Sequence, residues 1–219
     1  MTSEERREQR YQRRKAARLK KRQETIGKYD DFERVASLNS LYEAAREASK
    51  GVDWKASVQR YNSLLLFNIS KTRAELLAGK DIRRGFICFD ICERGKLRHI
   101  KSVHFSERVV QKSFCTNIIY PTFTRSLIYD NGASQQGKGT QFATNRLTTH
   151  LRRHFRKYGR EGGILLIDFS DYFGNVAHEP LFEIYRQIFT DPRVIALGMS
   201  FISAFGDKGL GLGLSLIHI

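Results

Sequence analysis

A single carboxylate stands where the sequence predicts the end of a buried strand. Four apolar residues, 164–167, lie between Gly163 and Asp168, a pattern that predicts a short buried strand. A carboxylate held at the end of such a strand suits Mg²⁺, a hard cation that takes oxygen ligands and usually keeps substrate phosphates too. Phe173, five residues later, adds an aromatic ring close to the same place. Taken alone, an aspartate after an apolar strand is more often a helix cap or a turn acid.

A second pattern with possible metal chemistry lies in the basic segment 140–158. His150 and His154 are one helical turn apart, a spacing that zinc can use. The segment lacks the glutamate of a metalloprotease helix and has no third ligand nearby, and Arg152 and Arg153 would repel a cation. We therefore expect this segment to face phosphates rather than to bind a metal.

The periodicity of apolar residues predicts the elements that position these groups. Residues 86–92 and 97–103 alternate in character around the turn Glu93-Arg94-Gly95-Lys96, which predicts a β-hairpin. A polar, glycine-rich loop is predicted at 130–140. Apolar residues recur at helical spacing in the segments 31–48, 54–77, 107–129, 140–158, 180–189 and 192–205. Pro121 interrupts the pattern within 107–129. Together these elements predict an α+β protein.

The charge of the chain is strongly positive and unevenly spread. Lys and Arg number 38 against 23 Asp and Glu in 219 residues, a net charge of +15. Residues 1–23 hold ten basic and three acidic side chains, a net of +7, so nearly half of the surplus lies in a tenth of the chain. Such a surplus favours a polyanionic partner, nucleic acid before an anionic membrane. Residues 1–23 contain helix formers and almost no apolar stripe, which predicts a frayed helix that becomes ordered on a polyanion; a solvated tail is the alternative.

Several classes of protein are excluded by composition. No run of 18 apolar residues exists, which argues against a transmembrane helix and against a membrane partner. The charged N-terminal segment lacks the apolar core of a secretory signal. Three cysteines are too few for a disulfide scaffold. We expect a cytoplasmic protein.

Several segments recur in an order that is typical of one family. They are the segment 89–100, the segment 106–112, Pro121, the segment 128–140 with its Gly137-Lys138-Gly139, and the segment 167–181. This series resembles the reverse transcriptases of bacterial retroelements, the group that includes group II intron, retron and diversity-generating enzymes. In that family the segments correspond to the fingers hairpin, the helix that follows it, a frequent proline, the second finger motif and palm motif A. The resemblance covers about residues 60–213, and Ala177 departs from it, because family members often have aspartate there.

This resemblance implies a right-hand polymerase fold within the α+β class. The expected parts are a basic helical N-terminal extension at 1–30, fingers with N-terminal helices at 31–160 and a partial palm at 161–219. The family's Tyr-x-Asp-Asp motif, which carries the remaining metal-binding aspartates, would lie beyond residue 219. Residues 214–219 also resemble translated adapter sequence. We therefore expect a fragment that is inactive as given, although the intact protein polymerises.

The resemblance also implies roles for residues at the nucleotide site. Asp168 matches the catalytic aspartate that binds Mg²⁺, and the backbone carbonyl of Phe169 matches a second metal ligand. Phe173 matches the aromatic that leaves no room for a 2′-hydroxyl, the group that distinguishes RNA from DNA substrates. Lys96 and Arg98 match the fingers residues that grip the deoxynucleoside triphosphate.

Four further basic residues are candidates for nucleic-acid binding. Arg108 and Lys138 are expected to hold the template backbone or to support the fingers, and Arg152 and Arg153 to face phosphates; a solvated surface charge is the alternative for the first two. The implied function is an RNA-directed DNA polymerase that extends a DNA primer on an RNA template with deoxynucleotides. The alternative is a non-polymerising nucleic-acid-binding or phage-defence protein built on the same scaffold.

Overall fold

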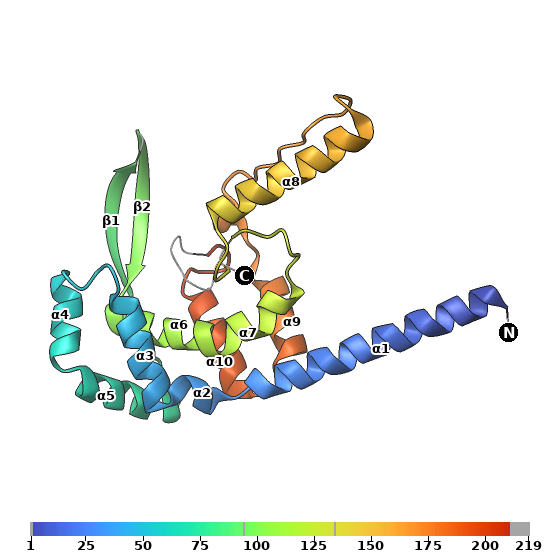
Figure 1. The fold of residues 1–219 in the computed structure, drawn as a ribbon. Helices are drawn as coiled ribbons and strands as arrows, with labels where there is room; N and C mark the ends of the chain where they lie inside the picture. The colour runs from blue at the N-terminus through green and yellow to red at the C-terminus, as the bar shows by residue number, and fades with distance from the viewer. Residues whose placement is uncertain (1, 94, 134, 211–219) are drawn as a thin grey trace.

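The computed structural model describes residues 2–93, 95–133 and 135–210. This part of the chain is mostly helical and has one two-stranded antiparallel sheet, which is compatible with the α+β class. A π-helical turn at Cys115–Ile119 joins α6 to α7, and 3₁₀ turns lie at Thr124–Ser126 and Phe173–Asn175. The elements in Figure 1 are α1 (Ser3–Tyr29), α2 (Phe32–Ala36), α3 (Leu38–Ser49), α4 (Ala56–Ser63), α5 (Leu65–Leu77), β1 (Phe86–Glu93), β2 (Lys96–Val103), α6 (Phe105–Phe114), α7 (Tyr120–Phe123), α8 (Thr140–Tyr158), α9 (His178–Ile188) and α10 (Pro192–Ser203).

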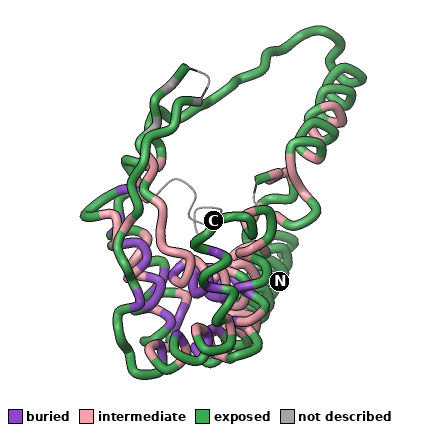
Figure 2. The backbone as a smooth tube through the Cα atoms, turned by 90° about the vertical axis from the view of Figure 1, so that its left-hand side faces the viewer, coloured by how far each residue is buried: buried purple, intermediate pink, exposed green. Residues whose placement is uncertain are grey.

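The core lies in a helical base made mainly by α2, α3, α5, α6 and α10. Phe114 of α6 and Phe201 of α10 are fully buried and meet edge to face, with ring centroids 5.9 Å apart. Gly198 lets α10 approach α9 closely, because a Cβ at this position would collide with the ring of Tyr185. Figure 2 shows the buried residues gathered in this base while the projecting parts of the chain are exposed. The core therefore joins helices from both sides of the domain boundary expected at residue 160.

The predicted helices are present, but three of them are divided. The segment 31–48 breaks at Ser37, whose backbone is extended and whose Oγ accepts a hydrogen bond from the Ser40 N–H at 3.1 Å, so that it caps α3. The segment 54–77 begins as a turn and divides at Leu64. Pro121 lies in the first turn of α7, where a proline is tolerated, after the π-helical turn. The helices predicted at 140–158, 180–189 and 192–205 match α8, α9 and α10.

The predicted hairpin is confirmed. β1 and β2 pair antiparallel from Phe86 opposite Val103 to Glu93 opposite Lys96. At its base the ring of Phe86 packs against that of Phe205, with centroids 4.9 Å apart. The two strands rise from the helical base on the side opposite α1, as Figure 1 shows.

The buried strand predicted at 164–167 is wrong. In the structure these four residues are neither a strand nor buried, and Leu166 is 90% exposed. A strand is stable only when a neighbouring strand satisfies its backbone groups. Within the described residues β1 and β2 pair with each other, and no strand lies beside 164–167. Asp168 therefore follows an extended, solvent-exposed segment.

The basic N-terminal extension is a single long helix, α1, in which no residue is buried. Its C-terminal end is fixed to the core by the carboxylate of Asp30, which accepts hydrogen bonds from the Thr190 N–H at 2.5 Å and the Thr190 hydroxyl at 2.6 Å. In return, the Asp191 carboxylate accepts a hydrogen bond from the Phe32 N–H at 3.3 Å. Among the described helices none is both long and apolar enough to cross a membrane.

Candidate functional site

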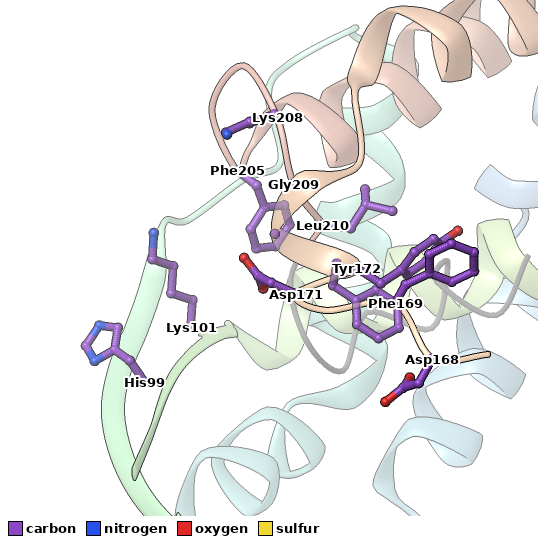
Figure 3. A pocket seen from close by; sticks show the side chains of 12 residues that line it. His99, Lys101, Asp168, Phe169, Asp171, Tyr172, Phe205, Lys208, Gly209 and Leu210 are labelled. Atoms are coloured by element: carbon purple, nitrogen blue, oxygen red, sulfur yellow. The ribbon is translucent and has the colours of Figure 1, made fainter. Parts of the chain in front are cut away.

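A cavity of about 960 Å³ lies where β2, the segment after Asp168 and the segment after α10 meet. Figure 3 shows the side chains that line it. Lys101 of β2 and Lys208 bring positive charge to the wall, and Asp168 and Asp171 bring negative charge. The remaining lining groups are His99, Phe169, Tyr172, Phe173, Gly174, Phe205, Gly209 and Leu210. The cavity thus combines cations, carboxylates and aromatic rings from three separate parts of the chain.

A tight turn shapes the acidic side of this cavity. Asp171 has a φ of +44°, a left-handed conformation that is uncommon for residues other than glycine. The N–H of Asn175 donates a hydrogen bond to the Asp171 carbonyl at 3.2 Å, and the Asn175 side-chain amide donates to the same oxygen at 3.0 Å. The Asp171 carboxylate folds over Gly174, where a Cβ would collide with it. The absence of a side chain at position 174 therefore lets Asp171 take this orientation.

Backbone hydrogen bonds tie this turn to the segment that follows α10. The Leu210 N–H donates to the Phe173 carbonyl and the Gly209 N–H donates to the Val176 carbonyl, both at 2.8 Å. The buried His178 donates from Nε2 to the Gly209 carbonyl at 2.6 Å. Gly209 has a φ of +89°, and a Cβ there would lie 3.1 Å from the Gly174 carbonyl oxygen, so glycine is required on both counts.

Three predicted site residues of the segment 167–181 lie together at the cavity. Asp168 and Phe173 both line it, and Phe169 is 71% exposed. The rings of Phe169, Tyr172 and Phe173 form a chain, with centroids 6.1 Å apart for the first pair and 5.3 Å for the second. In Figure 3 the carboxylates of Asp168 and Asp171 do not point toward one another.

The carboxylates at the cavity are too few to form a metal site made of protein ligands alone. The described residues contain no group of three or more His, Cys, Asp or Glu side chains that could hold a metal ion. Mg²⁺ in phosphate-handling sites is usually bound by one or two carboxylates together with waters and substrate phosphates, rather than by a cage of protein ligands. Such a cation needs only one or two carboxylates from the protein, and in the described residues Asp168 and Asp171 do not form a complete protein site.

Strand β2 carries the two residues expected to grip the triphosphate and two further residues that line the cavity. The side chains of Lys96 and Arg98 lie outside the described part of the structure. His99 and Lys101 of the same strand line the cavity, and neither was predicted from the sequence to be a site residue. His99 Nδ1 also lies 2.5 Å from Asp90 Oδ1 on β1. His99 and Lys101 are two residues apart in a predicted strand, so their side chains lie on the same face. This spacing was the sequence signal that could have identified them together.

The other candidate nucleic-acid-binding residues lie away from the cavity. Arg108 donates from Nη2 to the Ser102 hydroxyl at 3.2 Å, at the base of the hairpin. Lys138 donates from Nζ to the Tyr129 carbonyl at 2.7 Å and lies 4.9 Å from the centroid of the Tyr129 ring. Arg108 therefore supports strand β2, and Lys138 helps to position the loop before α8. Arg152 and Arg153 are exposed on α8.

An aspartate joins the loop before α8 to the helix itself. The Asp130 carboxylate accepts hydrogen bonds from the Arg146 guanidinium and from His150 Nε2, the latter at 2.6 Å. These two partners lower the pKa of Asp130 to about 2. His154 Nε2 lies 2.6 Å from the Glu161 carbonyl oxygen, to which it donates. Each histidine of the possible zinc pair is therefore already hydrogen-bonded to a loop residue.

Comparison with known proteins assigns no family to the chain. No protein-family model matches it, and no curated protein matches it. The functional interpretation therefore depends on the motif series and on the geometry of the cavity.

Proposed function

We propose that the chain carries the fingers and the first palm elements of a retroelement-type reverse transcriptase, an RNA-directed DNA polymerase. The observation that best supports this proposal is that Asp168 and Phe173, the two residues with the most specific matches to motif A, line one cavity together with Lys101 and Lys208. A protein that only binds nucleic acid does not need, at the same cavity, both a carboxylate that can bind a metal ion and an aromatic ring that can pack on the nucleotide sugar.

The cavity groups suit a deoxynucleoside triphosphate. Phosphoryl transfer is catalysed mainly by positioning and by electrostatic stabilisation, so the protein has little covalent chemistry to perform. Lys101 and Lys208 supply positive charge for phosphate oxygens, and Phe173 supplies a ring that packs on the sugar and excludes a 2′-hydroxyl. Asp168 and the Phe169 carbonyl would hold Mg²⁺, which neutralises phosphate charge when bound.

The proposed partners are an RNA template and a DNA primer. The exposed Arg152 and Arg153 on α8 are free to meet a phosphate backbone, and Arg108 supports the hairpin from its base. Backbone neutralisation of this kind is independent of sequence. We place this activity in the cytoplasm, in keeping with the composition of the chain.

The rival proposal is a non-polymerising nucleic-acid-binding or phage-defence protein on the same scaffold. The net charge of +15 fits both proposals equally. Equilibrium binding of deoxynucleoside triphosphate in the presence of Mg²⁺ separates them. The polymerase proposal requires a nucleotide site that depends on Asp168, whereas the rival predicts nucleic-acid binding with no such site.

A further inference from the structure

Helix α1 is the largest feature that the proposed polymerase site does not use. No residue of α1 is buried, and its ten cations within residues 1–23 leave a net charge of +7 there. Its contacts with the core lie at its C-terminal end, where Arg125 donates from Nη1 to the Thr25 hydroxyl at 3.0 Å and where Asp30 meets Thr190. Most of the helix therefore projects from the core into solvent, as Figure 1 shows.

The cations of α1 occupy somewhat more than half of the circumference of the helix. At 3.6 residues per turn they fall on an arc of roughly 220° around the axis. Arg7, Arg10, Arg14 and Arg18 form a row within this arc and line one shallow hollow on the surface of the helix. The rest of the circumference carries no Lys or Arg, and its residues are Glu5, Glu8, Gln9, Gln12, Ala16, Leu19 and Gln23.

Repulsion between these cations destabilises helix α1 unless an anion is present. The pairs Arg6–Arg10, Arg10–Arg14 and Arg14–Arg18 each put like charges one helical turn apart, which destabilises a helix by about 0.2–0.5 kcal/mol for each pair. Burial in the core does not compensate, because α1 has no buried residue. A capping box at the first turn, in which Thr2 and Glu5 exchange hydrogen bonds of 2.8 and 3.2 Å, gives limited support. A polyanion would remove the repulsion along the whole row.

We propose that α1 is an arm that binds the phosphate backbone of a nucleic-acid duplex. A helix that lies on a flat anionic surface contacts it with less than half of its circumference. The cations of α1 cover an arc of roughly 220°, so a helix placed in a groove would turn cations toward both walls of the groove. An α-helix is about 10–12 Å across, which matches the major groove of B-form DNA at about 12 Å. The major groove of A-form RNA is too narrow, so this geometry favours DNA.

A single strand fits the arm less well. Single-strand-binding surfaces combine positive charge with aromatic rings on which bases stack. Tyr11, which is 56% exposed, is the one aromatic residue on the basic arc of residues 3–24. The helix spans about 40 Å, so it is long enough to cross the major groove of about 12 Å and to contact the phosphate backbone on both sides. The arm needs neither a nucleotide nor Asp168, so this inference is independent of the proposed polymerase activity.

The test measures how salt weakens duplex binding by the full 219-residue chain. A fluorescein-labelled 20-base-pair DNA duplex, the RNA duplex of the same sequence and one single strand are titrated by fluorescence anisotropy between 50 and 300 mM salt. The arm variant carries Arg7→Gln, Arg10→Gln, Arg14→Gln and Arg18→Gln, because glutamine keeps helix propensity while removing charge. The matched control removes the same charge at exposed positions outside α1, through Arg60→Gln, Lys71→Gln, Lys80→Gln and Arg186→Gln.

Loss of four phosphate contacts should reduce the slope of log K against log salt by about 3 to 4 and weaken duplex binding at least tenfold. The control should keep the wild-type slope within about 1, and the four arginines replaced by lysine should restore the slope. Circular dichroism checks that the arm variant keeps its helix content. Tighter binding of the DNA duplex than of the RNA duplex would support binding in the major groove, because the major groove of A-form RNA is too narrow for a helix. Equal slopes for the arm variant and the control, or a single strand bound as tightly as duplex, would overturn the proposal.

Discussion

His178 donates its Nε2 hydrogen to the carbonyl oxygen of Gly209, 2.6 Å away and 31 residues later in the chain. A carbonyl oxygen only accepts, so the hydrogen is on Nε2 of the imidazole. The bond is buried, and it holds the segment after α10 against the turn that carries Asp171 and Phe173. One wall of the candidate site is therefore fixed by a histidine that does not itself line the cavity.

Replacing this histidine should loosen that wall. His178→Phe keeps an aromatic ring but leaves the Gly209 carbonyl without its donor, and we expect the free energy of unfolding to fall by about 1–3 kcal/mol. Urea denaturation measures the change. His154→Phe is the control, because it removes a similar bond to the Glu161 carbonyl at an exposed position, where water replaces the lost donor, and it should change stability by less than about 0.5 kcal/mol. Equal effects of the two substitutions would show that the buried bond contributes nothing specific.

Two glycines should respond in opposite directions to alanine. Gly209→Ala forces a Cβ onto a φ of +89° and within 3.1 Å of the Gly174 carbonyl, so we expect a loss of about 1–3 kcal/mol. Gly27 lies within α1 with nothing within 4 Å of a Cβ, and Gly27→Ala should stabilise its helix by about 0.5–1 kcal/mol. Thermal unfolding followed by circular dichroism measures both. A neutral Gly209→Ala would contradict the described path of this segment.

The nucleotide site should depend on both motif A residues, in different ways. Asp168→Asn should weaken Mg²⁺-dependent binding of a deoxynucleoside triphosphate at least tenfold, since it removes a carboxylate ligand. Phe173→Val should leave deoxynucleotide binding largely intact but raise the affinity for ribonucleotides, because the smaller side chain admits a 2′-hydroxyl. The ratio of the two affinities should therefore fall. Isothermal titration calorimetry with the paired nucleotides measures both effects. If Phe173→Val weakened both nucleotides to the same degree, its role in sugar selection would be refuted.

The loop before α8 should detach in acid through Asp130. Its pKa is lowered to about 2 by Arg146 and His150, below the value of about 3.9 in an unfolded chain. Between these values the unfolded state binds more protons, so the stabilisation from this carboxylate is complete above about pH 4 and is lost as the pH falls through about 2. Hydrogen exchange of the loop amides in the wild type and in Asp130→Asn measures it. The variant should exchange faster at pH 7, and the difference should shrink toward pH 2; a difference that is constant over this range would argue against the ion pairs.

Local patterns were sufficient to predict the hairpin and most helices. The alternation around Glu93-Arg94-Gly95-Lys96 gave the paired strands, and the bounds of α8 follow from Gly139 and Gly159 on either side of a helical run. Ser37 divided a predicted helix because its side chain caps the next one, a competition that periodicity does not register.

Contacts between distant segments were not predictable in the same way. Residues 164–167 have the composition of a buried strand, but a strand also needs a neighbour, and composition does not specify one. The pairing of Gly209 with Val176 joins two irregular segments, so no periodic signal marks it. Asp168 and Phe173 were identified from their motif, whereas Lys101 and Lys208 became candidates only when the fold brought them to the same cavity.

The central claim is that Asp168 and Phe173 belong to the nucleotide site of an RNA-directed DNA polymerase. Its most direct test is primer extension on an RNA template, carried out with residues 1–219 and with the product of the gene read past codon 213, where the resemblance predicts the Tyr-x-Asp-Asp motif. The account predicts that the longer product incorporates deoxynucleotides according to the template in Mg²⁺ and that Asp168→Asn abolishes this activity. Template-directed incorporation that persists in Asp168→Asn, or a longer product that contains the motif and never extends the primer, would contradict it.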